Sequence, residues 1–192
     1  ACRDAMALAE RGHPLRISVN VSSWQFANTN VWEVVTAALR ESGLPPERLE
    51  LEITESLVLE GANDPEIAMR DLRGIGVGIA LDDFGTGYSS LSYVSRFPLD
   101  VLKIDRTIVR DVDTDPSAER VARAVVGLAH SLDMRVVAEG VDGEGQAEVL
   151  RRLDCDELQG FGICEGVRLP ELIERIERGD FGGKAKLGVI PL

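Results

Sequence analysis

Acidic and amide side chains follow several short apolar stretches, and they are the residues that could do chemistry. The clearest example is IALDDFGTGYSSL (79–91), in which Asp82 and Asp83 end an apolar stretch and a glycine-broken loop follows. Other stretches end in a comparable way, at Asn20, Glu52, Lys103, Asp105, Glu139 and Gln159. If these ends meet, they form one cluster of carboxylates around a single ammonium group.

Such a cluster predicts a divalent metal site. Two unit charges about 4 Å apart repel by roughly 4 kcal/mol at an effective dielectric constant near 20, so grouped carboxylates must protonate, hydrate or bind cations. Carboxylate and amide oxygens suit Mg²⁺ or Mn²⁺ rather than Zn²⁺. Adjacent aspartates could hold two ions about 3.5–4 Å apart, an arrangement that clamps the attacking and leaving oxygens in phosphoester hydrolysis. Lys103 could then orient the attacking water or stabilise charge on the phosphate.

A structural interpretation is open for each of these residues taken alone, because a single acidic residue after a strand is usually a helix cap or a solvated loop residue. Glu55 could anchor a loop rather than bind a metal, and we expect Glu50 to be solvated or structural. We expect Trp24, Trp32 and Phe26 to lie in the core. What favours a site is the recurrence of polar groups at six predicted strand ends.

The sequence predicts strands that alternate with helices. Six strands are expected, at 16–22, 49–55, 77–83, 100–105, 135–141 and, more weakly, 155–163. Helices are expected between and after them, at 31–42, 65–74, 116–132, 145–153 and 169–177. This alternation indicates βαβ units and a parallel sheet.

Side chains alternate between two faces along each predicted strand. In 16–22, one face carries Ile17, Val19 and Val21, and the other carries polar residues. A sheet with one apolar face under helices and one polar face fits a TIM-like (β/α)8-type barrel, whose active sites lie at the C-terminal ends of the strands. By the same alternation Asp82 points into the barrel, so a turn is needed to bring Asp83 to the same side.

The composition narrows the class of protein. A chain of 192 residues with 44% hydrophobic residues is long enough for a sizeable core. Its net charge of −12 argues against binding a nucleic-acid polymer or an anionic membrane surface. Three scattered cysteines and an N-terminus without an apolar leader segment predict a cytoplasmic location, although a parent protein could be anchored in a membrane.

Six motifs together resemble one family. In chain order they are VNVS, LEITES, ALDDFGTGYSSLSYV, LKIDR, VVAEGV and CDELQGF, and they span about residues 15–162. The chain is similar to EAL-type cyclic di-GMP phosphodiesterases of bacteria. The resemblance implies a single domain over 1–192 that hydrolyses cyclic di-GMP to linear pGpG. It also implies Mg²⁺ or Mn²⁺ as the cofactor, with two ions in the site.

The resemblance gives a ligand set for these metals. Asn20, Glu52 and Asp82 match ligands of one ion, and Asp82, Asp83 and Glu139 match ligands of the second.

Other positions match residues with different roles in the family. Lys103 matches the lysine that positions the catalytic water, and Glu139 also matches a general base. Asp105 and Gln159 match positions near the substrate, and Glu55 matches a glutamate that steadies the loop after the aspartates. That loop lies near a dimer contact in the family, so the resemblance implies a homodimer in which the loop links association to metal binding. Sensory or cyclase domains are expected in the parent protein.

Two departures from the family pattern affect these expectations. The first barrel strand, which carries the Glu-Ala-Leu motif and one metal ligand, has no match here, and residues 1–12 resemble the helix that follows it. Three explanations are open: the chain is a fragment of a longer protein, the missing part was excluded or is disordered, or the chain is a natural remnant that binds without turnover. At the other end, residues 165–192 diverge from the family. The barrel is therefore expected to be incomplete and its activity reduced, and a catalytically inactive receptor or protein-interaction module is the alternative function.

Overall fold

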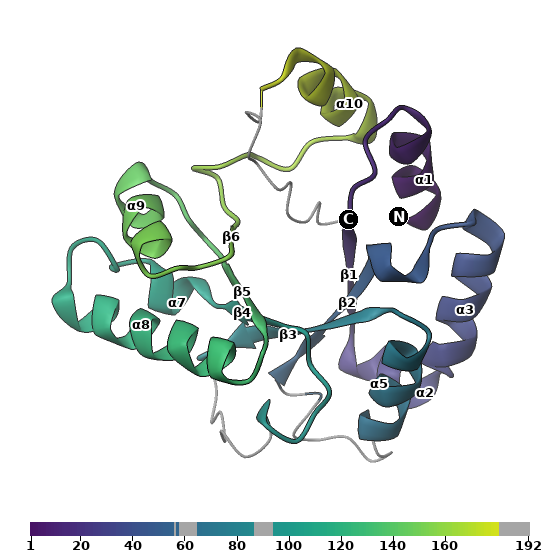
Figure 1. Cartoon of the computed structure of the whole chain (residues 1–192), viewed down its shortest axis with the longest axis horizontal. Coiled ribbons are helices and arrows are strands. Elements are labelled where there is room, and N and C mark those ends of the chain that lie inside the picture. The colour runs from purple at the N-terminus through teal and green to yellow at the C-terminus, as the bar shows by residue number, and fades with distance from the viewer. Residues whose placement is uncertain (56, 58–64, 87–93, 181–192) are drawn as a thin grey trace.

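Six parallel strands form one curved sheet in the computed structural model of the chain. The structure describes residues 1–55, 57, 65–86 and 94–180. The strands follow the order of the sequence: β1 (Ile17–Val21), β2 (Leu49–Thr54), β3 (Gly78–Phe84), β4 (Val101–Ile104), β5 (Arg135–Ala138) and β6 (Glu157–Leu158). All five pairings are parallel. The sheet is a half-barrel with β1 and β6 at its two edges (Figure 1).

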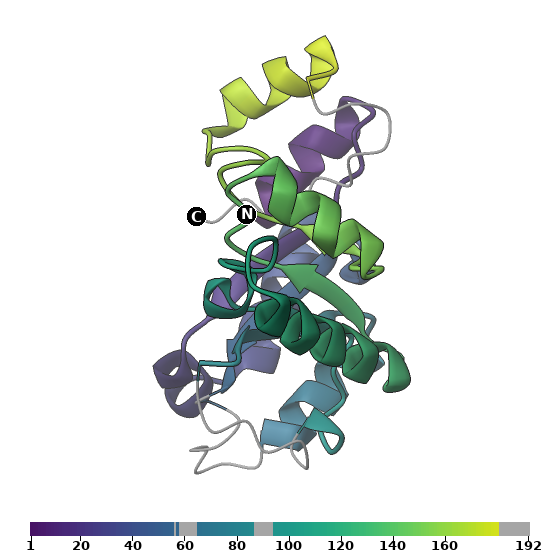
Figure 2. The same cartoon turned by 90° about the vertical axis from the view of Figure 1, so that its left-hand side faces the viewer.

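Helices cover the outer side of this sheet (Figure 1). The longer ones are α1 (Cys2–Glu10), α3 (Val31–Ser42), α5 (Pro65–Gly74), α8 (Pro116–Ser131) and α9 (Glu144–Arg152). The last helix, α10 (Leu169–Arg178), lies apart from the strands, near α1 (Figure 1). Shorter turns are α2 (Ser23–Asn28), α7 (Arg106–Val109) and the 3-10 helix η1 (Pro46–Arg48). The first and last helices lie at the same end of the molecule (Figure 2), where Arg11 Nη1 is 3.6 Å from Glu177 Oε1. Across the described residues, no helix is long and apolar enough to span a bilayer.

Local signals explain why the predicted helices begin and end where they do. Asn30 accepts a hydrogen bond from the backbone N–H of Glu33 and so caps α3, which ends at Gly43 with a φ of 73°. Asp115 caps α8 in a similar way, and Pro116 supplies the fixed φ that suits a first helical position. The five helices predicted from periodicity are present within one residue of their expected ends.

The last two strands of the sheet, β5 and β6, are shorter than predicted. β5 stops at Ala138 because Gly140 has a φ of 67°, which an extended strand does not allow. β6 has two residues, although the sequence predicted a strand over 155–163. The two tryptophans were also predicted wrongly: Trp24 is 69% exposed and Trp32 is 42% exposed, whereas Phe26 packs partly buried against the core.

The interior of the half-barrel is layered, because alternate residues of each strand point inward. A middle layer is apolar and fully buried, and it consists of Ala80, Val101 and Val137. Two residues further along these faces lie Asp82, Lys103 and Glu139, at the C-terminal ends of the strands. The main core is separate and lies between the sheet and the helices. The predicted apolar outer face is confirmed, and the inner face is charged at the C-terminal ends of the strands as predicted, but its middle layer is apolar.

Candidate metal centre

Lys103 lies at the centre of the residues predicted to form a site. It comes from β4 and its side chain is 3% exposed. Its Nζ lies 2.9 Å from Glu52 Oε2, 3.1 Å from Asp82 Oδ1 and 2.7 Å from Glu139 Oε1. Three strands thus bring their carboxylates to one ammonium group. We call Glu52, Asp82, Asp83, Lys103 and Glu139 the site cluster.

A local irregularity in β3 brings the two aspartates together. The register between β3 and β4 shifts between Leu81 and Phe84, and Asp83 has a φ of 58°. A non-glycine residue with positive φ is uncommon, and aspartate is among those that tolerate it. The bend confirms the predicted turn: Asp83 no longer points to the opposite face, and its backbone N–H donates to Asp82 Oδ1 at 3.0 Å.

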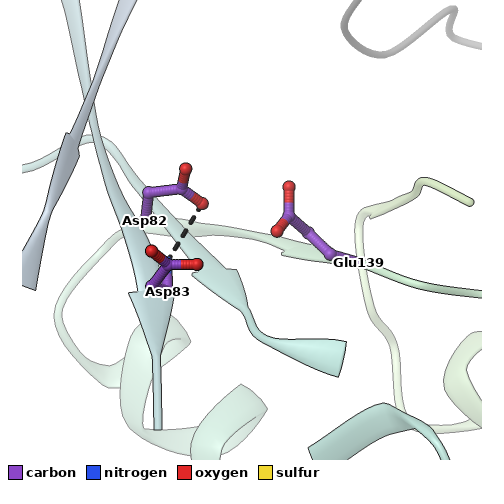
Figure 3. A group of neighbouring side chains, drawn as sticks. All are labelled: Asp82, Asp83 and Glu139. Atoms are coloured by element: carbon purple, nitrogen blue, oxygen red, sulfur yellow. Dashed lines mark hydrogen bonds between the residues drawn. The ribbon is translucent and has the colours of Figure 1, made fainter. Parts of the chain in front are cut away.

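Glu139 completes this group from the other side (Figure 3). It follows β5 directly, and its backbone N–H donates to Ile104 O at 3.0 Å, which holds it beside β4. Gly140 then turns the chain away, and a Cβ at this position would lie 2.5 Å from Arg106 Cγ. Asp82, Asp83 and Glu139 each offer a carboxylate oxygen, and these three oxygens lie within 4.8 Å of one another.

The electrostatics of the site cluster are those of crowded, buried charges. Burial raises the pKa of Glu52 and of Glu139, although Lys103 opposes the shift in both cases. Burial also raises the pKa of Asp83, with the neighbouring charges of Asp82 and Asp105 adding to it. For Lys103, burial favours the neutral amine, but the carboxylates of Glu52, Glu139 and Asp82 together outweigh it and raise its pKa. Lys103 is therefore an ammonium group at neutral pH.

The donor set fits a hard divalent cation. Three carboxylate oxygens already lie close enough to share one ion. Among the described residues, Oε1 of Glu52 is buried without a hydrogen-bond partner, which is unfavourable for a carboxylate unless a cation or another donor binds it. All the donor atoms of this set are oxygens, the type that Mg²⁺ and Mn²⁺ prefer.

The other predicted site residues lie around this cluster with differing degrees of contact. Asn20 is the register partner of Glu52 on the neighbouring strand, and it is exposed at the sheet edge. Glu55 is buried directly after β2. Asp105 Oδ1 caps α7 by accepting hydrogen bonds from Thr107 N at 2.8 Å and Thr107 Oγ1 at 2.6 Å.

Gln159 follows β6, the last described strand. Its backbone N–H donates to Ala138 O at 2.8 Å, which places it beside the strand that leads to Glu139. Its side-chain Oε1 is buried and accepts no hydrogen bond from the described part of the chain. A buried amide oxygen without a donor is consistent with a contact to a ligand. The glycine-broken loop after the aspartates, FGTGYSS (84–90), continues into 87–93, outside the described residues. Within its described part Gly85 has a φ of 108°, as a glycine-dependent turn requires.

One buried residue beside the site was not predicted. Gln146 Oε1 accepts hydrogen bonds from Asp142 N at 2.7 Å and Gly143 N at 3.1 Å, and its Nε2 donates to Arg110 O at 2.8 Å. It therefore holds the segment that follows Glu139 against the segment that follows β4. Its place three residues after Gly143, the N-cap of α9, is the capping-box position for a glutamine and is a signal that could have identified it.

Comparison with known proteins places this geometry in a family. The EAL domain family matches residues 1–165. The bifunctional diguanylate cyclase/cyclic di-GMP phosphodiesterase MucR of Pseudomonas aeruginosa is 42% identical over 177 residues, which are 92% of this chain and 26% of MucR. The chain spans about a fifth to a quarter of the length of the first curated relatives that it matches.

Solved structures agree with the sequence relatives. The PaMucR phosphodiesterase in complex with c-di-GMP has a TM-score of 0.84 and 40% identity, covering 90% of this chain and 70% of that one. The manganese/cy-diGMP complex of Klebsiella pneumoniae BlrP1 has a TM-score of 0.76 and 28% identity, covering 84% of this chain and 41% of that one. With six strands in a barrel-like order and the family match over most of its length, the chain belongs to the EAL domain family.

Proposed function

We propose that this chain is a divalent-metal-dependent phosphodiesterase that hydrolyses cyclic di-GMP to linear pGpG. The observation that carries the proposal is the group formed by Asp82, Asp83 and Glu139, whose oxygens lie within 4.8 Å of one another beside the ammonium of Lys103. The c-di-GMP complex of PaMucR supports the choice of substrate.

The proposed cofactor is Mg²⁺ or Mn²⁺, with two ions bound. Asn20, Glu52 and Asp82 would hold one ion, and Asp82, Asp83 and Glu139 would hold the other. When bound, the ions would neutralise the phosphate charge and lower the pKa of a bound water. The manganese complex of BlrP1 supports this assignment. Since the chain carries a net charge of −12, bound cations would also reduce its repulsion of an anionic dinucleotide.

The side chains around the metals have separate roles in the proposed reaction. Lys103 stays protonated because carboxylates surround it, so it donates hydrogen bonds to a water or a phosphate oxygen and does not accept a proton. Glu139 has a raised pKa owing to burial, which makes its carboxylate a stronger base and suits it to take the proton of the attacking water. In this proposal Asp105 and Gln159 lie on the substrate side, and Glu55 supports the loop after the aspartates.

A catalytically inactive receptor or interaction module is the second candidate. Lys103 Nζ contacts three carboxylates within 3.1 Å, so part of the negative charge is neutralised without any metal. A domain of this kind would bind cyclic di-GMP or a protein and release no product.

Hydrolysis of cyclic di-GMP with Mn²⁺, followed by chromatography, tests the two candidates, with binding measured on the same sample. The proposed enzyme produces pGpG, and the Asp83→Asn variant loses at least about 100-fold of that activity because a charged ligand is gone. Asp71→Asn, an exposed position on α5, is the matched control and should keep wild-type activity. Binding of intact dinucleotide without product would favour the receptor and contradict the enzyme.

We also propose a homodimer whose contact lies near the loop after Asp83, and sensory or cyclase domains in the parent protein. The name of MucR, which includes a cyclase, and the small share of MucR that this chain covers support the second point. A cytoplasmic location belongs to the same proposal, and its support is that all three cysteines are free thiols. Equal activity in an enforced monomer would contradict the link between association and metal binding.

A further inference from the structure

A second group of charged residues lies inside the half-barrel, at the N-terminal ends of the strands. We call Ser18, Glu50, Arg135 and Glu157 the basal cluster. Arg135 Nη2 is 2.7 Å from Glu50 Oε2, and its Nη1 is 2.8 Å from Glu157 Oε1. Ser18 Oγ donates to Glu50 Oε1 at 3.1 Å. Glu50 is 4% exposed, so its charge is buried and is compensated by these contacts. The sequence predicted that Glu50 is either solvated or structural, and the structural alternative is correct.

The contact between Arg135 and Glu50 crosses the interior of the sheet. Arg135 begins β5 and Glu50 lies on β2, with β3 and β4 between them. Neighbouring strands are about 4.8 Å apart, so β2 and β5 in a flat sheet would be separated by about 14 Å, with their side chains perpendicular to the sheet. A contact of 2.7 Å between these side chains therefore requires the sheet to be curved. The Arg135–Glu50 ion pair ties two non-adjacent strands at a fixed curvature.

The strands tied in this way are the ones that carry the site. Glu50 lies two residues before Glu52 on the same face of β2, and Arg135 lies four residues before Glu139 on the same face of the chain. Val137, 2% exposed, packs between the two clusters. On the C-terminal side of Val137, Lys103 Nζ links the two carboxylates, at 2.9 Å from Glu52 Oε2 and 2.7 Å from Glu139 Oε1. A cation that bound these carboxylates would compete with Lys103 for them, whereas the basal ion pairs lie outside the proposed ligand set.

We propose that Arg135 is a positioning residue for the metal centre. Arg135 holds β5 to β2 from inside the half-barrel. It thereby fixes the distance between the carboxylates of Glu52 and Glu139, which a bound cation must bridge. Glu50 is the anchor for this function, because it lies on the strand that carries Glu52. Glu157 lies on β6, the direct neighbour of β5, and its ion pair adds no tie across the interior. This inference rests on the proposed function, since it concerns the geometry of the same metal centre.

The matched pair Glu50→Gln and Glu157→Gln tests the proposal, with Mn²⁺ binding followed by calorimetry and unfolding temperature measured in parallel. Each variant removes one carboxylate charge from the same guanidinium. Glu50→Gln should weaken Mn²⁺ binding at least about 10-fold, the size seen when groups that orient metal ligands are lost. Glu157→Gln should bind Mn²⁺ with nearly wild-type affinity. Arg135→Met should bind Mn²⁺ as weakly as Glu50→Gln does, or more weakly.

A variant destabilised elsewhere separates positioning from simple loss of stability. Leu172→Ala removes a fully buried side chain from α10, which lies outside the sheet, and should lower the unfolding temperature without changing Mn²⁺ affinity. The proposal is overturned if Glu50→Gln and Glu157→Gln bind Mn²⁺ equally well, or if affinity follows the unfolding temperature across all four variants. Failure of the wild-type chain to bind Mn²⁺ would overturn the proposed function, and this inference with it.

Discussion

Glu50 and Glu52 are neighbours on one face of β2, both are buried, and their surroundings differ in one respect. Both carboxylate oxygens of Glu50 have partners, one in Ser18 and the other in Arg135. Glu52 has Lys103 on one oxygen, while within the described residues its other oxygen has no hydrogen-bond partner. The basal cluster is thus satisfied, and the site cluster two residues further along the strand is not.

The backbone of the two clusters differs as well. The basal residues lie in regular strand positions, whereas the site cluster contains a register shift and an aspartate with a φ of 58°. A non-glycine residue in this conformation costs of order 1–2 kcal/mol relative to ordinary backbone. Uncompensated charge and unfavourable backbone at the same place are typical of a functional site, where binding a ligand supplies the missing interactions. This contrast supports the proposed binding role of the site cluster, whereas the basal cluster is compensated without a ligand.

Replacing Lys103 should disturb the site cluster most strongly. Lys103→Met leaves three carboxylates facing one another in a buried site, and breaking a buried ion pair in this way costs about 3–5 kcal/mol. Mn²⁺ should recover part of that stability, because the ion can replace the lost positive charge and binds only the folded state. Denaturant unfolding with and without Mn²⁺ measures both effects.

Arg40→Met, at an exposed position on α3, is the control for loss of a positive charge. It should change stability by less than about 0.5 kcal/mol and should show no additional response to Mn²⁺. A Lys103→Met protein that is as stable as wild type without metal would show that the ammonium does not hold the site cluster together.

Glycine at Asp83 should separate stability from function. Asp83→Gly relieves the positive φ and removes a carboxylate from a crowded site, so the metal-free protein should gain about 1 kcal/mol while hydrolysis is lost. Asp133 is a matched control because it also has a φ of 58° and is exposed at the end of α8. Asp133→Gly should bring a similar gain in stability and leave hydrolysis unchanged. Loss of stability in Asp83→Gly alone would contradict the view that this position is kept for function.

Periodicity and alternation were sufficient to predict most of this fold. Apolar residues at helical spacing located α3, α5 and α8, and alternation along the strands assigned Asp82 to the interior. These patterns are local, and each requires only that one face of an element be buried. The same local rules could not place Trp24, because apolar character alone does not decide whether a side chain finds a buried position.

Long-range contacts were beyond such reasoning. Glu50 and Arg135 are 85 residues apart in sequence, and their ion pair depends on the curvature of the whole sheet. Sequence alternation alone also placed Asp83 on the wrong face, and only the expectation of a turn corrected it. The strand predicted over 155–163 has only two residues in the structure. A Cβ at Gly162 would lie 2.6 Å from the backbone of Asp142, so the segment after this strand packs tightly against the loop that follows Glu139.

The pH dependence of stability distinguishes the two clusters through a smaller effect. Burial and neighbouring charges raise the pKa of Asp83, so the folded state binds a proton more readily than the unfolded state does. Its contribution to stability is present below the ordinary carboxyl pKa of about 4 and is lost as the pH rises through the raised value. In the absence of metal, the wild type should therefore lose stability relative to Asp83→Asn as the pH rises from about 4 through the raised pKa of Asp83. We expect a smaller change than for the substitutions above, because Asp83 is half-buried and solvent screens its charge.

Urea unfolding of wild type, Asp83→Asn and the exposed control Asp71→Asn at several pH values measures this difference. Subtracting one variant from another cancels the titration of distant carboxylates such as Glu66 and Glu119, whose pKa values are lowered by hydrogen bonds from arginines. The difference that remains reports Asp83 together with the neighbours that are coupled to it, Asp82 and Asp105. Adding Mn²⁺ should reverse the sign, since the ion binds the deprotonated carboxylates and its affinity rises with pH. A wild-type curve that runs parallel to that of Asp83→Asn in both conditions would mean that Asp83 is as well compensated as Glu50, and the distinction between the two clusters would fail.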